Sequence, residues 1–204
     1  ISCGRIQARP RRSFKENMES QNEFFIDQTL YSGAPDRLFE RSETERLVYQ
    51  TLERLHIPFT RVDHAPAATI ADCKNVDRLL GTEMCKNLFL TNAQKTAFYL
   101  LLMPGEKPFR TKDLSKQIGS ARLSFADAEY MWEFLHIRPG AVSVMGLLFD
   151  TERRVRLLID RELLSAPCLG CHPCENTSSL GIATADILNV FLPYTGHSYT
   201  EITL

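Results

Sequence analysis

Two apolar runs with a short polar turn between them constrain the fold more than any other feature. Residues 87–90 read NLFL, residues 97–103 read AFYLLLM, and the turn TNAQK separates them. Two strand-forming runs joined by such a turn predict a β-hairpin. Because the apolar residues are continuous rather than alternating, we expect both faces of these strands to be covered. The longer run is far too short to cross a membrane as a helix.

Helix and strand signals follow one another along the rest of the chain. Ser42 and Glu45 form a capping box, which predicts a helix that ends near residue 56. Periodicity predicts further helices over residues 72–82, 113–118, 126–135 and 184–192, and further strands over residues 59–63, 141–149, 155–159, 178–182 and 199–203. The sequence therefore predicts a mixed α/β fold, with a mixed central sheet flanked by helices, in one domain over about residues 30–204.

The charge of the chain is unevenly distributed. The 204 residues carry a net charge of −1, but residues 1–17 alone carry +4. We interpret residues 1–17 as a basic extension outside the domain, either a natural upstream or targeting segment or a remnant of an expression vector. The balance of the remainder argues against a DNA-binding surface but allows contact with one end of an RNA. No apolar segment follows the basic opening, so we expect a cytoplasmic protein with no membrane partner.

Residues 168–174 read CLGCHPC and contain three of the six cysteines. The first five letters match the C-x-x-C-H pattern of covalent haem attachment, but that maturation needs export and a proline follows the histidine. Zinc sites take two ligands from each of two segments, and no second C-x-x-C is present. We therefore expect no metal and no cofactor here, and interpret the cysteines as small, partly buried thiols in a loop.

Familiar catalytic signatures are absent from the sequence. No G-x-S-x-G, H-E-x-x-H, Walker A or G-x-G-x-x-G pattern occurs. Because these signatures are absent, the reactions that remain open to the chain include those that need no nucleophile from the protein.

Six segments, in this order, resemble the YbaK/prolyl-tRNA-synthetase editing-domain family, and most of all its freestanding alanyl-tRNA(Pro) deacylases. They are DHAPAATI at 63–70, KNLFL at 86–90, FYLLLMPGEKP at 98–108, RLSFADAE at 122–129, PGAVSVMGLLFD at 139–150 and GCHPCENTSSLGI at 170–182. No single segment is specific, but the six in order are. The resemblance covers roughly residues 30–204.

The resemblance implies an editing pocket and its residues. Lys86 would meet the phosphate or sugar of the terminal adenosine, and His172 would help to place the substrate; these two are the expected catalytic residues. The other implied substrate contacts are Asn87, Gly170, Cys171, Pro173, Asn176, Thr177 and Met145. Met145 lies in the segment VSVMGL, where relatives more often show Val-Ser-Pro-Phe, and this difference implies a pocket wall of different shape. For each of these residues an ordinary structural role is the alternative; for His64 we prefer a capping or loop role.

The implied activity is hydrolysis of the ester of mischarged Ala-tRNA(Pro) by water, assisted by the ribose of the substrate. The implied partner is the acceptor end of tRNA(Pro), with prolyl-tRNA synthetase or an elongation factor as further candidates. Two alternatives remain open at this point, namely a Cys-tRNA(Pro) deacylase of the YbaK type and a non-catalytic module that binds tRNA or a synthetase.

Overall fold

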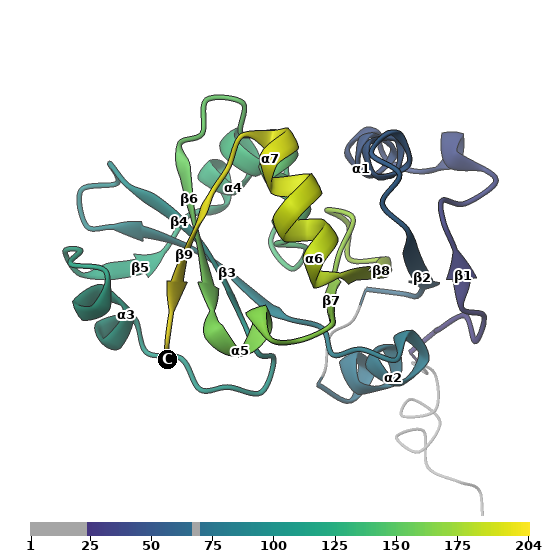
Figure 1. The fold of residues 1–204 in the computed structure, drawn as a ribbon, viewed down its shortest axis with the longest axis horizontal. Coiled ribbons are helices and arrows are strands. Elements are labelled where there is room, and N and C mark those ends of the chain that lie inside the picture. The colour runs from purple at the N-terminus through teal and green to yellow at the C-terminus, as the bar shows by residue number, and fades with distance from the viewer. Residues whose placement is uncertain (1–23, 67–69) are drawn as a thin grey trace, which may run out of the picture.

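The computed structural model describes residues 24–66 and 70–204, so the predicted basic extension of residues 1–17 lies outside the described residues. Strands and helices follow one another along the chain in the order β1, α1, β2, α2, β3, β4, α3, β5, α4, β6, α5, β7, β8, α6, α7 and β9 (Figure 1). Within the described residues, none of the helices combines the length and the apolar character needed to cross a membrane.

The strands divide between two sheets. The larger, five-stranded sheet has the order β5-β3-β4-β6-β9, and the smaller, four-stranded sheet has the order β1-β2-β8-β7. The strands of the larger sheet are β3 (Lys86–Asn92), β4 (Phe98–Met103), β5 (Leu123–Phe125), β6 (Val155–Asp160) and β9 (Tyr199–Ile202). Those of the smaller sheet are β1 (Tyr31–Ser32), β2 (Phe59–Asp63), β7 (Cys168–Cys171) and β8 (Ser178–Ala183).

The predicted hairpin is confirmed as β3 and β4, which pair antiparallel at the centre of the larger sheet. β4 pairs parallel with β6, and β6 with β9, so the sheet is mixed. All six residues of β4 are buried. Phe98, Leu100 and Leu102 pack into one apolar cluster, and the alternate residues Tyr99, Leu101 and Met103 pack into another. The continuous apolar run thus covers both faces of the sheet, as expected.

The smaller sheet is antiparallel throughout and lies between two helices. These are α1 (Glu43–Arg54) above the sheet and α2 (Ile70–Leu80) below it in the view of Figure 1. Tyr49 of α1 stacks on Phe59 of β2 with ring centroids 5.7 Å apart. On the other side, Val76 and Leu80 of α2 pack with Val62 of β2. The Ser42 cap of α1 is confirmed, since its side chain accepts a hydrogen bond from the Glu45 amide.

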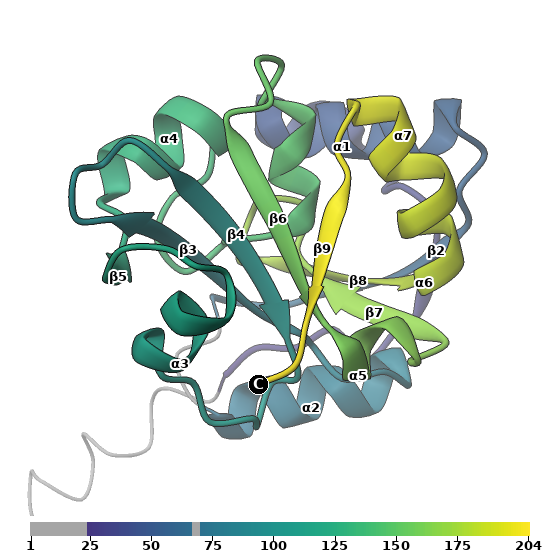
Figure 2. The same ribbon diagram turned by 60° about the vertical axis from the view of Figure 1, so that its left-hand side comes forward.

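The remaining helical segments surround the larger sheet (Figure 2). They are α3 (Thr111–Gln117), α4 (Ala128–Leu135), α5 (Arg161–Leu164), and a continuous C-terminal run of α6 (Thr184–Asp186), a π-helical turn (Ile187–Phe191) and α7 (Leu192–Thr195). Two short 3₁₀ helices complete the set, at Leu38–Glu40 and Val144–Leu148.

The structure confirms the mixed α/β class but changes three details of the sequence prediction. The expected single central sheet is two sheets. The strand expected over residues 141–149 is wrong, because residues 144–148 form a buried 3₁₀ helix capped by Ser143. At its centre, a Cβ on Gly146 would lie 2.6 Å from Ile137 Cδ1 and 3.0 Å from Leu135 Cβ, so a larger residue would force these side chains to shift. An apolar run buried on all sides carries no period that separates strand from helix.

The loop expected at residues 168–171 is wrong too, since these residues form β7. Residues 168–171 alone give no strand pattern, and pairing with β8 makes them a strand. β7 also contacts the segment before β3, where Gly170 donates to the Glu83 carbonyl and accepts from the Cys85 amide. A Cβ on Gly170 would lie 2.7 Å from Glu83 O and 2.8 Å from Met84 Cα. The absence of a side chain at Gly170 is therefore what lets the two sheets meet.

Replacing Gly170 with alanine should lower the free energy of unfolding by about 3 kcal/mol, because backbone atoms on the other side of the junction cannot move aside. Urea unfolding followed by circular dichroism measures the change. Gly119→Ala is the control, because it adds a Cβ that meets nothing within 4 Å at a positive φ and should cost only about 1 kcal/mol. Equal costs for the two variants would contradict the junction described above.

Candidate active site

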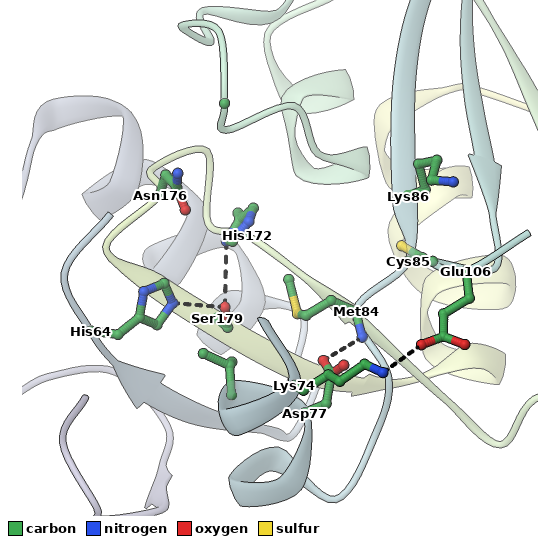
Figure 3. A pocket seen from close by; sticks show the side chains of 13 residues that line it. His64, Lys74, Asp77, Met84, Cys85, Lys86, Glu106, His172, Asn176 and Ser179 are labelled. Carbon is green, nitrogen blue, oxygen red and sulfur yellow. Dashed lines mark hydrogen bonds and ion pairs between the residues drawn. The ribbon is translucent and has the colours of Figure 1, made fainter. Parts of the chain in front are cut away.

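One pocket of 710 Å³ opens where the two sheets meet. Its walls come from α2, from the starts or ends of β2, β3, β4 and β7, from β8, and from the turn after α4 (Figure 3). The lining residues are His64, Lys74, Val76, Asp77, Met84, Cys85, Lys86, Gly105, Glu106, Gly140, His172, Asn176 and Ser179. Figure 3 shows Lys86 and Glu106 on one side of the pocket and His64, His172 and Asn176 on the other.

Lys86 is the first residue of β3 and is half-buried. Its ammonium group donates a hydrogen bond of 2.8 Å to the main-chain carbonyl of Lys107, in the segment after β4. The partner is a neutral carbonyl, so the positive charge is held in place without being neutralised by it. The neighbouring pocket charges, by contrast, pair with each other, since Lys74 lies 3.0 Å from the Glu106 carboxylate. Lys86 is thus placed to attract an anionic group at the pocket.

His172 follows β7 directly and presents a neutral ring to the pocket. Its Nδ1 lies 2.9 Å from the Ser178 carbonyl, which can only accept, so Nδ1 carries the proton. The Nε2 lone pair is then available to accept a hydrogen bond at the pocket wall. The pKa of His172 is lowered to about 4, mainly by burial, with a smaller lowering effect of the nearby His64 ring and an opposing effect of the Ser178 carbonyl. The imidazole is therefore uncharged at neutral pH.

The main chain at His172 is fixed by the 3₁₀ helix of residues 144–148. The hydroxyl of Ser143, which caps that helix, donates a hydrogen bond of 2.6 Å to the His172 carbonyl. The Ser143 hydroxyl oxygen also accepts a hydrogen bond of 3.2 Å from the Met145 amide. Met145 itself is fully buried and is not among the pocket-lining residues.

A second imidazole, His64, joins His172 through the hydroxyl of Ser179. His64 Nδ1 donates to the Ala65 carbonyl at 2.7 Å, so its Nε2 accepts from the Ser179 hydroxyl at 2.9 Å. The Ser179 oxygen also lies 3.5 Å from His172 Nδ1. Burial lowers the pKa of His64, against opposing effects of the Ala65 carbonyl and Asp63. The pocket wall therefore holds two neutral rings with matching tautomers.

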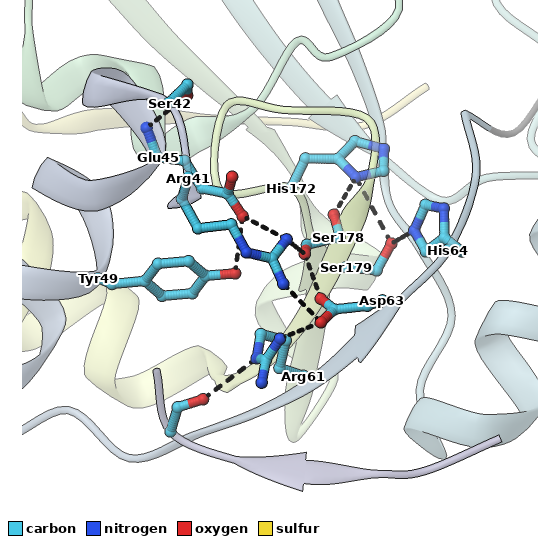
Figure 4. A network of polar contacts seen from close by, with 11 residues as sticks. Arg41, Ser42, Glu45, Tyr49, Arg61, Asp63, His64, His172, Ser178 and Ser179 are labelled. Atoms are coloured by element: carbon cyan, nitrogen blue, oxygen red, sulfur yellow. Dashed lines mark hydrogen bonds and ion pairs between the residues drawn. The ribbon is translucent and has the colours of Figure 1, made fainter. Parts of the chain in front are cut away.

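Asp63 anchors a network of charges behind this wall (Figure 4). Its carboxylate accepts from Arg41, from the buried Arg61 and from the Ser178 hydroxyl. Burial alone would raise the pKa of Asp63, but the Ser178 hydrogen bond and the two arginines outweigh it and lower the pKa. Ser178 is the residue whose carbonyl holds His172, so the network fixes the strand segment that sets the tautomer of His172.

The structure brings three of the residues expected at the site into one pocket, namely Lys86, His172 and Asn176. The other expected contacts, Asn87, Gly170, Cys171, Pro173, Thr177 and Met145, are not among its lining residues. For these six, a role in substrate binding stays a prediction. The lining residues His64 and Ser179 were not expected as site residues. His64 offered one signal, since it directly follows a predicted strand, whereas Ser179 offered none.

Several of these six residues have structural partners instead. The Asn87 amide donates to the Cys85 carbonyl at 3.0 Å, while its own oxygen is buried without a partner. The Thr177 carbonyl accepts from the His64 amide. Gly170 faces the backbone of residues 83 and 84, as described above.

The cysteines of the CLGCHPC segment are free thiols, and Cys171 and Cys174 are buried. Burial raises the pKa of both well above the ordinary value, and it raises the pKa of Cys85 to about 11. These thiols therefore stay protonated and weakly reactive at neutral pH. Within residues 24–66 and 70–204, no three histidine, cysteine, aspartate or glutamate residues are grouped so that they could hold a metal ion.

Comparisons with known proteins agree on one family. The model of the aminoacyl-tRNA editing domain matches residues 64–190. The chain is 28% identical over 162 residues to the prolyl-tRNA editing protein ProX of Acetoanaerobium sticklandii, covering 79% of this chain and 98% of that protein. It is 34% identical over 150 residues to the prolyl-tRNA synthetase associated domain-containing protein 1 of Danio rerio, covering 72% of this chain and 80% of that protein.

Solved structures share the fold at lower sequence identity. A candidate trans-editing enzyme for prolyl-tRNA synthetase matches with a TM-score of 0.58 at 18% identity, over 80% of this chain and 99% of that chain. The sequence resemblance is thus confirmed by a family model that spans more than half of the chain: the chain belongs to the aminoacyl-tRNA editing domain family.

Proposed function

We propose that this protein acts in trans to hydrolyse the ester that joins alanine to mischarged tRNA(Pro). Editing follows from the family, and the names of the relatives, which refer to prolyl-tRNA and its synthetase, support the choice of tRNA. The observation that carries the proposal is the pocket at the sheet junction, where the Lys86 cation and the neutral His172 ring lie on opposite sides. That arrangement suits an aminoacylated terminal adenosine, which carries an anionic phosphate on one side of its ribose and the aminoacyl ester on the other.

In the proposed reaction, water attacks the ester carbonyl and the bond from the carbonyl carbon to the ribose oxygen breaks. The proton of the water passes to the ribose oxygen, with help from the neighbouring ribose hydroxyl, and free alanine and an intact tRNA end are released. Amide groups of the loop after β7 are the proposed donors to the developing oxyanion. No side chain forms a covalent intermediate, so the protein contributes positioning and electrostatic stabilisation.

Lys86 and His172 have complementary parts in this scheme. Lys86 holds the phosphate or sugar of the terminal adenosine, a contact that suits a compact point charge on a flexible stem. The Nε2 atom of His172 accepts a hydrogen bond from the ribose hydroxyl or from the attacking water, a part that only the neutral ring can take. Val76 and Met84 supply apolar lining for the small side chain of alanine.

The proposed preference for alanine has a physical reason. Alanine is smaller than proline and enters a proline-binding site, and each missing methylene is discriminated by only about 1–3 kcal/mol. A synthetase alone therefore mischarges some tRNA, and a second site that excludes proline by its size removes the error.

Lys86→Ala should lower kcat/KM for Ala-tRNA(Pro) by about 100-fold, comparable with the loss of one strong electrostatic contact to the substrate. Release of alanine from labelled Ala-tRNA(Pro) measures the rate. Lys95→Ala is the matched control, because Lys95 forms an exposed ion pair with Asp127 away from the pocket. Equal rates for Lys86→Ala and the wild type would remove Lys86 from the mechanism, and no hydrolysis by the wild type would refute the proposed activity.

The contribution of His172 should depend on pH only in the acid range. Its pKa is lowered to about 4, so the ring stays neutral, and able to accept through Nε2, until the pH falls close to that value. The ratio of wild-type to His172→Ala rates removes the pH dependence of the ester itself. We expect this ratio to be flat from pH 7.5 to about pH 5.5 and to fall toward pH 4. A fall centred near pH 6.5, the value of a solvated histidine, would contradict the buried, neutral ring.

A further inference from the structure

A second cavity, of 570 Å³, lies between the start of α1 and the end of α4. It is lined by Ser42, Glu43, Thr44, Leu47, Trp132, His136, Arg138, Phe149 and Glu175. Trp132 is the single tryptophan of the chain, and 51% of its surface is exposed. Half of the Trp132 surface is therefore available to a ligand.

Trp132 belongs to a stack of planar groups. Its ring lies 5.4 Å from His136 with an interplanar angle of 16°, and His136 lies 4.8 Å from Phe149 with an angle of 13°. His136 ends α4 with a left-handed backbone, φ 51° and ψ 36°, which places its ring between the other two. The Arg138 guanidinium lies 5.9 Å from the centre of the Trp132 ring. The outcome is a supported aromatic surface with a long cation beside it.

Such a surface suits a nucleobase. Every base has a flat π-face, and an aromatic ring with an arginine that can close over it is the usual way to hold an unpaired base. The charges of the cavity narrow the choice of ligand. Glu43 and Glu175 repel a phosphate, but a carboxylate accepts hydrogen bonds from the exocyclic amino group of a base. Adenine, cytosine and guanine carry such an amino group and uracil does not; the single-stranded CCA end of a tRNA offers cytosine and adenine.

The cavity adjoins the candidate active site. Arg138 precedes Gly140 by two residues, and Glu175 precedes Asn176 directly; Gly140 and Asn176 line the first pocket. These two segments lie close together, because a Cβ on Gly140 would lie 3.6 Å from Nδ2 of the Asn176 side chain. A chain whose end occupies the first pocket can therefore reach the second cavity past Gly140 and Asn176.

We propose that the Trp132 cavity binds an unpaired cytosine or adenine of the RNA, a few nucleotides before the esterified end. The inference rests on the proposed function, because it concerns the same RNA. The base stacks on Trp132, Arg138 closes over it, and Glu43 or Glu175 accepts from its amino group. The single-stranded CCA end common to tRNAs supplies bases of this kind.

Because Trp132 is the only tryptophan, its fluorescence reports directly on this cavity. The uncharged oligoribonucleotide ACCA should quench the emission in a saturable way, while UUUU, which has no exocyclic amino group, should bind at least 5-fold more weakly. Neither RNA carries an ester, so the result is independent of whether the protein hydrolyses aminoacyl-tRNA. Absence of quenching, or equal quenching by both RNAs, would overturn the proposal. So would a concentration-dependent emission change without RNA that accompanies dimer formation, since the face would then be a protein contact.

Variants give a second, independent measurement with fluorescein-labelled ACCA and anisotropy. Trp132→Ala should weaken binding by about 5- to 100-fold, the range found for loss of one stacked base. Glu175→Ala should reduce the preference for ACCA over UUUU. Phe125→Ala is the matched control, because Phe125 is an aromatic residue with 59% exposure outside both cavities, and it should bind ACCA as the wild type does. Wild-type affinity in Trp132→Ala, with circular dichroism showing an intact fold, would refute the stacking role.

Discussion

The close approach of two backbones at Gly170 is the constraint on which the rest of this structure depends. β7 of the smaller sheet lies against residues 83–85, which lead directly into β3 of the larger sheet. Lys86 is the first residue of β3, and His172 is the first residue after β7. The two sheets also share one apolar core, and this backbone contact brings a cation and an imidazole, distant in the sequence, to the same pocket. A side chain at residue 170 would push these two backbones apart, and with them Lys86 and His172.

The charged groups behind the pocket are arranged so that its two histidines, His64 and His172, stay neutral. Asp63 collects two arginines and the Ser178 hydroxyl behind the wall, and the Ser178 carbonyl in turn fixes the proton of His172 on Nδ1. Burial disfavours the charged form of both His64 and His172. Lys86 then faces these two neutral imidazoles across the pocket, which suits a substrate that brings its own negative charge and its own reactive ester.

The sequence predicted those parts of the fold whose signals are local. The hairpin of β3 and β4, the Ser42 cap of α1 and the strand Phe59–Asp63 are examples, because turn chemistry, capping and β-branched or aromatic content are properties of neighbouring residues. β7 could not be predicted, because a strand of two cysteines, a leucine and a glycine exists only through its partner β8. The buried helix of residues 144–148 reads as a strand for a similar reason, since an apolar run covered on all sides has no period. In the pocket, Lys86, His172 and Asn176 were found through family resemblance, whereas Ser179 lies in an ordinary strand and gains its place from the fold alone.

The central claim is that the junction pocket removes alanine from tRNA(Pro) in trans. Presenting the purified chain with Ala-tRNA(Pro), Cys-tRNA(Pro) and Pro-tRNA(Pro) in parallel, and comparing the initial rates of amino acid release, tests it most directly. We predict rapid release of alanine, slow release of cysteine and no release of proline above the uncatalysed rate. Release of cysteine faster than alanine would assign the pocket to a different editing task, and release of proline at a similar rate would contradict selection by size.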